Sequence, residues 1–91
     1  MRFIQIIVVG KVQGVFFRRF TREKARQLQL KGFVCNRHDG SVYIEAGGHT
    51  EKIQQFIDWC NQGPEAAEVV NVTVNTIEPQ DFKEFEIRNA R

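Results

Sequence analysis

A loop with two glycines, followed by a group of arginines, is the part of this sequence best suited to chemistry. The loop is residues 10–14 (GKVQG), and Arg18, Arg19 and Arg22 follow it closely. Glycine permits backbone conformations in which successive N–H groups point inward and hold an anion. Arginine adds a planar fork of donors that fits a phosphoryl group. These residue types in this order predict a site for a phosphate or a similar anion.

The position of the arginines supports this prediction, because they fall where a helix is expected to begin. A helix N-terminus carries about half a positive charge, so each cation there costs a few tenths of a kcal/mol. Glu23 is the one nearby acid, whereas the second expected helix opens with Glu51 in the usual way. The loop is neither a Walker loop nor a G-x-G-x-x-G fingerprint. The alternative interpretation is a surface turn followed by a solvated basic face.

The elements that must position this loop follow from hydrophobic periodicity. The spacing predicts two amphipathic helices, one with Phe17, Phe20, Ala25 and Leu28 on its apolar stripe and one with Ile53, Phe56, Ile57 and Cys60. We expect Gly32 to end the first helix, Thr50 to cap the second and residues 61–64 (NQGP) to end it. Strands are predicted at 3–9, 33–36, 42–46 and 70–74, with a short one at Phe85 and Ile87. The first strand reads as buried on both faces, or nearly so.

This order of elements, β-α-β-β-α-β with a short extra C-terminal strand, is typical of an α+β protein. It predicts a ferredoxin-like sandwich, in which one antiparallel sheet carries both helices on one face. The length of 91 residues suits a single domain over 1–91. Because this fold hosts many unrelated functions, the architecture alone does not define the activity.

Three blocks of the sequence resemble the acylphosphatase family. Residues 10–18 (GKVQGVFFR) are similar to the family signature G-x-V-Q-G-V-x-F-R. Residues 32–36 (GFVCN), followed by 39–42 (DGSV), are similar to its second block. A weaker match lies at 63–69, in Gly63, Pro64, Ala67 and Val69. The resemblance covers essentially the whole chain.

The resemblance implies an enzyme that hydrolyses the carboxyl-phosphate bond of acyl phosphates to carboxylate and inorganic phosphate. It implies that Arg18 grips the phosphate and that Asn36 orients the attacking water. The implied cradle of backbone N–H groups comprises Gln13, Gly14, Val15, Phe16, Phe17 and Arg18. It also implies no cofactor and no metal, a monomer, and inorganic phosphate as product and inhibitor. The resemblance assigns no chemical step to Arg19, Arg22 or His38.

An acyl phosphate is an activated anhydride with a good leaving group, so little acid catalysis is needed. The protein mainly has to hold the phosphoryl group and stabilise the charge on its oxygens. Asn36 has no useful pKa, and would therefore position the water rather than deprotonate it. The acidic residues are scattered, with no pair placed for general acid and base catalysis.

Composition excludes several other classes of function. The net charge of +2 is mild for a nucleic-acid binder, and no stretch approaches the length of a membrane span. The sequence opens without a recognisable signal peptide, so we expect a cytoplasmic protein. Cys35 and Cys60 read as small buried hydrophobes kept reduced, although whether they pair is left open. We expect His38 and His49 to be solvated, whereas Phe16 can be a lid or a core residue.

Three other functions are compatible with parts of this sequence. An RNA-binding RRM shares the fold, and residues 31–33 (KGF) echo its signature, but they lie on the second strand rather than the third and lack the following aromatics. Acylphosphatase-like domains also occur in hydrogenase-maturation carbamoyltransferases, which use carbamoyl phosphate. Because this sequence ends at Arg91 without a transferase segment, we expect a free-standing hydrolase. A phosphate-binding protein without turnover is disfavoured by the presence of both Arg18 and Asn36.

Overall fold

The computed structural model describes residues 1–90 and confirms the predicted order of elements. Those elements are β1 (Arg2–Lys11), α1 (Phe17–Gln27), β2 (Lys31–Asn36), β3 (Val42–Gly48), α2 (Thr50–Gln62), β4 (Glu68–Thr76) and β5 (Phe85–Ile87). The four main strands extend beyond their apolar stretches, because backbone pairing continues where the side chains are no longer hydrophobic. Gly47, for example, pairs with Phe3 outside the predicted strand.

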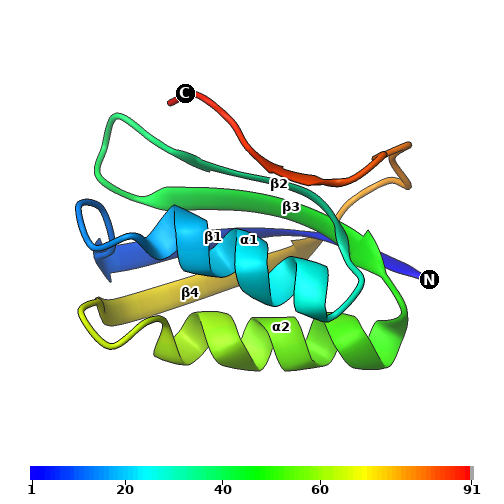
Figure 1. Cartoon of the computed structure of the whole chain (residues 1–91), viewed down its shortest axis with the longest axis horizontal. Coiled ribbons are helices and arrows are strands. Elements are labelled where there is room, and N and C mark those ends of the chain that lie inside the picture. Colours follow the sequence, from blue (N-terminus) through cyan, green and yellow to red (C-terminus); the bar gives the residue numbers. More distant parts are fainter. Residues whose placement is uncertain (91) are drawn as a thin grey trace.

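The strands form one sheet in the order β4-β1-β3-β2-β5, and both helices cover the same face of it (Figure 1). The pairs β1–β3, β1–β4 and β2–β3 are antiparallel, as predicted. The short last strand differs, because β5 pairs parallel to β2. The chain reverses direction after β4 and reaches the opposite edge of the sheet, where it runs along β2 in the same direction. The sheet is therefore mixed rather than wholly antiparallel.

The main core lies between the sheet and the two helices. On β1, Ile4, Ile6 and Val8 face the helices and are fully buried, whereas Gln5 and Ile7 between them are half-buried. The expectation that this strand is buried on both faces is therefore wrong, because no helix covers the second face. The apolar stripe of α2 is confirmed, and all four of its predicted residues are buried.

The stripe of α1 is confirmed at three of its four predicted positions. Phe17, Ala25 and Leu28 are buried, but Phe20 is 43% exposed. Thr21 takes its place in the core, where its hydroxyl donates to the carbonyl of Phe17 at 2.7 Å. This bond back to the preceding turn satisfies the hydroxyl and lets a polar residue be fully buried.

Two predicted helix boundaries are wrong. Helix α1 ends at Gln27, and Gln29 adopts the left-handed conformation (φ 60°), so Gly32 does not terminate the helix. Gly32 lies inside β2 instead. Helix α2 begins at Thr50, so the capping position falls on His49, whose side chain makes no capping hydrogen bond.

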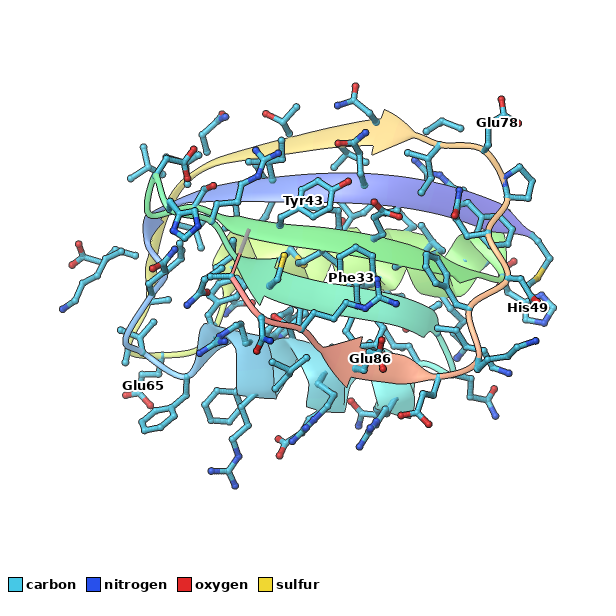
Figure 2. All side chains as sticks on the ribbon, turned by 90° about the horizontal axis from the view of Figure 1, so that it is seen from above. Phe33, Tyr43, His49, Glu65, Glu78 and Glu86 are labelled. Atoms are coloured by element: carbon cyan, nitrogen blue, oxygen red, sulfur yellow. The ribbon has the colours of Figure 1, made fainter. Side chains whose placement is uncertain are left out.

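The other face of the sheet carries a small aromatic cluster, labelled at Phe33 and Tyr43 in Figure 2. Tyr43 therefore faces the open side of the sheet. The Arg88 guanidinium lies 4.0 Å from the centre of the Phe33 ring, and the Arg37 guanidinium lies 4.9 Å from that of Tyr43. Such cation–π contacts let charged groups cover an apolar surface.

The two cysteines lie on opposite faces of the sheet. Cys35 belongs to the open-face cluster, whereas Cys60 is part of the core beneath the helices. The sheet separates them, so they do not pair with each other. Burial raises the pKa of the Cys60 thiol, which keeps it protonated and unreactive.

Residues 1–90 contain no helix that is long and apolar enough to cross a membrane. Within the same residues, no group of three or more His, Cys, Asp or Glu side chains is arranged to hold a metal ion.

The role of Gly32 gives a test of the fold. Its φ of +149° is unfavourable for other residues, and an added Cβ would overlap the carbonyl oxygen of Glu45 on β3. We expect Gly32→Ala to lower the free energy of unfolding by about 2–4 kcal/mol, since both strain and overlap oppose it. Gly40→Ala is the matched control: its φ is +94°, but its Cβ would meet nothing within 4 Å. Urea denaturation that shows equal losses for the two variants would contradict this account.

Candidate active site

A cavity of about 290 Å³ opens between the β1–α1 loop, the first turn of α1 and the ends of β2 and β5. The residues that line it are Val12, Gln13, Gly14, Phe16, Phe17, Arg18, Arg19, Asn36 and Ile87. The glycine-containing loop and the arginine-rich helix start therefore meet the predicted second block of the sequence in one place.

The N-terminus of α1 supplies unused backbone donors at this cavity. The first turn contains no acidic residue, and no side chain caps it. The N–H of Phe20 donates to the carbonyl of Phe16 at 3.1 Å and begins the helical hydrogen-bond pattern. The N–H groups that precede it have no acceptor within the helix. Together with the helix dipole, they make this end of α1 a favourable place for an anion.

The loop leading into α1 alternates its backbone conformation. Gly14 has φ 76° and Phe16 has φ 62°, both left-handed, with Val15 between them. Alternation of left- and right-handed residues is the geometry by which consecutive N–H groups form an anion-binding concavity. The side chains of Val12 and Val15 are buried in the core and anchor the loop. Val15 does not line the cavity with its side chain, so it can contribute only its backbone.

The charge of Arg18 is not compensated by a neighbouring acid. Glu23 forms an ion pair with Arg19 instead, at 3.6 Å, and both of those side chains are well exposed. Within residues 1–90, Arg18 makes no hydrogen bond or ion pair, although it is half-buried at the cavity wall. Its guanidinium is therefore available to a bound anion.

Asn36 reaches the cavity from the end of β2. Side chains alternate along a strand, so Asn36 shares a face with Val34, which is fully buried beneath the helices. The Oδ1 atom of Asn36 is buried and has no hydrogen-bond partner among the described residues. Leaving such an acceptor unpaired costs about 1–3 kcal/mol. It is therefore suited to accept a hydrogen bond from a small molecule in the cavity.

The side chain of Gln13 ties the loop to the β2–β3 hairpin. Its Nε2 donates to the carbonyls of Arg37 and Ser41, at 2.8 and 2.9 Å. Asp39 braces the same turn, since it accepts the hydroxyl and the N–H of Ser41 at 2.6 and 2.9 Å. Both hydrogen bonds lower the pKa of the Asp39 carboxyl, and the bond from the Ser41 hydroxyl has the larger effect. These contacts thus fix the position of the loop relative to the end of β2, which carries Asn36.

The structure brings most of the predicted site residues together. Gln13, Gly14, Phe16, Phe17, Arg18 and Asn36 all line the cavity. His38 and His49 are exposed, as expected, and neither lines it. Sequence reasoning missed Ile87, which β5 places beside Val34, and it missed the tether made by the Gln13 side chain. No local pattern signals either contact, because both join segments far apart in the chain.

Comparisons with known proteins agree with this arrangement. The family model for Acylphosphatase matches residues 4–87. A curated acylphosphatase from Shewanella amazonensis is 48% identical over 91 residues, covering 99% of this chain and 100% of that protein. The solved structure of an acylphosphatase from Coxiella burnetii has a TM-score of 0.93 at 41% identity, covering 96% of this chain and 92% of that one.

A similar unit also occurs within a much longer chain. The solved structure of full-length HypF, in its phosphate- and nucleotide-bound form, has a TM-score of 0.92 at 32% identity. The match covers 98% of this chain but 12% of HypF.

The fold and the cavity define a small α+β protein that presents an uncapped, basic helix N-terminus to a small pocket. The full-length relatives specify it further: the chain belongs to the acylphosphatase family. It is therefore a hydrolase of the acylphosphatase type, and its ferredoxin-like architecture is that of the family's solved members.

The tether made by Gln13 can be tested by stability. We expect Gln13→Met to lower the free energy of unfolding by about 1–2 kcal/mol, because both of its hydrogen bonds are lost from a half-buried position. Gln54→Met on the exposed surface of α2 is the control, with an expected change within about 0.5 kcal/mol. Urea denaturation measures both variants. A Gln13 variant as stable as the control would show that the tether contributes nothing.

Proposed function

We propose that this cavity binds the phosphoryl group of an acyl phosphate and hydrolyses it through Arg18, Asn36 and the loop N–H groups. One observation carries the proposal. An uncompensated arginine and an uncapped helix N-terminus share a cavity with the buried, unpartnered Oδ1 of Asn36. The first two features suit a phosphoryl group, and the third suits a water molecule beside it.

The phosphoryl group would be held by two kinds of donor. The backbone N–H groups of residues 13–18 would contact its non-bridging oxygens, while the fork of Arg18 closes the site from one side. These donors are fixed before the substrate arrives, because Val12 and Val15 anchor the loop in the core. Preorganised donors stabilise the charge on the oxygens in the transition state without reorganising.

Asn36 would orient the attacking water. Its Oδ1 accepts a hydrogen bond from that water and directs the water oxygen at phosphorus, opposite the leaving group. The new P–O bond forms as the bond from phosphorus to the acyl oxygen breaks, and the electron pair leaves with the carboxylate. The proton released from water passes to a phosphate oxygen or to solvent. Inorganic phosphate and a carboxylate are the products.

No side chain has to act as an acid or a base in this scheme. A carboxylate is a weak base, so it leaves without being protonated. The charge of the phosphoryl group is met by Arg18 and the backbone donors. The rate enhancement therefore depends on positioning and on electrostatic stabilisation, as in other phosphoryl transfers.

Arg18 gives the first test of the mechanism. With benzoyl phosphate as substrate and EDTA present, we expect Arg18→Ala to lower kcat/KM by about 10³-fold or more. Arg18→Lys should recover little of this loss, because a point charge does not replace the planar fork. Lys24→Ala is the control, since this cation lies on the same helix but outside the cavity. It should leave kcat/KM unchanged, and a fully active Arg18→Lys enzyme would argue against bidentate binding.

Asn36 gives a second test, which separates orientation of water from binding of phosphate. We expect Asn36→Ala to lower kcat by about 10²-fold, the scale expected for one positioned hydrogen bond in a transition state. Inorganic phosphate should inhibit the wild type competitively, and its inhibition constant should be little changed in the variant.

Two results would contradict this assignment. Loss of phosphate affinity in step with kcat would mean that Asn36 grips the phosphoryl group instead of the water. A wild-type protein that binds phosphate but releases no benzoate would be a binding protein without turnover.

A further inference from the structure

Phe16 breaks three local rules at once. It is a large aromatic residue that is 70% exposed, although its neighbour Phe17 is buried and packs against Trp59. Its φ of 62° lies in the left-handed region, which is unfavourable for a non-glycine residue. It also occupies the N-cap of α1, where Ser, Thr, Asp or Asn would supply a capping oxygen.

The position of Phe16 offers a reason for its presence. Its side chain lines the cavity at the N-terminus of α1, next to the loop and Arg18. Strained backbone conformations persist mainly where the surrounding structure enforces them, and they cluster at functional sites. Because the ring is exposed rather than packed into the core, it is available to a ligand that enters the cavity.

The lining of the cavity also includes apolar residues, of which Ile87 is half-buried whereas Val12 and Phe17 are almost fully buried. Ile87 comes from β5, which lies next to β2 at the edge of the sheet. The donors of the cavity are concentrated on Arg18, Asn36 and the loop backbone. A ligand that matches both the hydrogen-bond donors and the apolar lining has an anionic end and an apolar end.

The size of the cavity limits that apolar end. At about 290 Å³ it is at the small end of ligand pockets, which commonly measure about 300–1,000 Å³. A phosphoryl group and one ring or short branched chain are of the right scale.

We infer that Phe16, together with Ile87 from the same cavity lining, contacts the acyl group of the substrate and makes this enzyme selective for acyl phosphates with an aromatic or bulky apolar acyl group. The inference rests on the proposed function, because it assigns the acyl side of the same site. Phe16 then has two roles. Its backbone N–H belongs to the phosphate cradle, and its ring selects the acyl group.

The experiment compares two substrates that differ only beyond the carbonyl, benzoyl phosphate and acetyl phosphate. We expect the wild type to favour benzoyl phosphate in kcat/KM. Phe16→Gly and Phe16→Asn should reduce that preference by about tenfold, the scale of one aromatic contact, mainly through the benzoyl value. Both replacements tolerate a left-handed φ at a helix N-cap, so neither threatens the fold.

Phe20→Ala is the matched control. Phe20 lies one turn further along the exposed side of α1, is 43% exposed, and lines a different hollow. Its removal should leave the ratio of the two kcat/KM values unchanged. A ratio unaffected by the Phe16 variants, or equal losses with both substrates, would overturn the inference.

A binding measurement keeps this test separate from that of the proposed function. Phenacylphosphonate and acetonylphosphonate replace the scissile oxygen with a methylene group and cannot be hydrolysed at that position. Calorimetry should show tighter binding of the phenacyl compound to the wild type, and loss of that advantage in Phe16→Gly. If neither acyl phosphate is hydrolysed but this difference in binding persists, the hydrolytic mechanism fails and the role of Phe16 stands. If the two phosphonates bind equally well to the wild type, the role of Phe16 is refuted.

Discussion

Helix α1 begins with a positive end that no described part of the protein neutralises, and the architecture of the site follows from this charge. Arg18 stands where an acidic residue would be favourable, and Phe16 occupies the N-cap without a capping group. The arrangement is unfavourable by itself and becomes favourable when an anion is bound. Val12 and Val15 fasten the loop below it to the core.

The second constraint is the distance in sequence between the two side chains that we propose act together. Arg18 lies on a helix and Asn36 at the end of a strand, so only the packing of α1 on the sheet brings them to one cavity. The register of β2 decides which face Asn36 occupies, and a slip of one residue would turn it to the open face. Gly32 lets β2 approach β3 closely, and Gln13 fixes the loop against the same hairpin.

The short strand β5 serves both faces of the sheet. Ile87 points to the helix side and completes the cavity wall, whereas the next residue, Arg88, lies over the ring of Phe33 on the open face. The hydrogen bond from the N–H of Arg88 to the carbonyl of Val34, at 2.9 Å, holds this strand beside the end of β2. The three-residue strand and the residue that follows it therefore link the site to the aromatic cluster on the opposite face.

By itself, the sequence determined the order of the elements, the apolar stripe of α2, the helix start rich in arginine and the resemblance of its motifs to a known family. These properties are local, because periodicity, charge near a helix end and short motifs are each contained within one segment. The tertiary structure decided that Gly32 serves a close strand contact, that Thr21 replaces Phe20 in the core, and that β5 runs parallel to β2. It also decided that Ile87 and the Gln13 side chain belong to the site. Each of these depends on which distant segments lie together, and side-chain spacing along one segment carries no information about its partner.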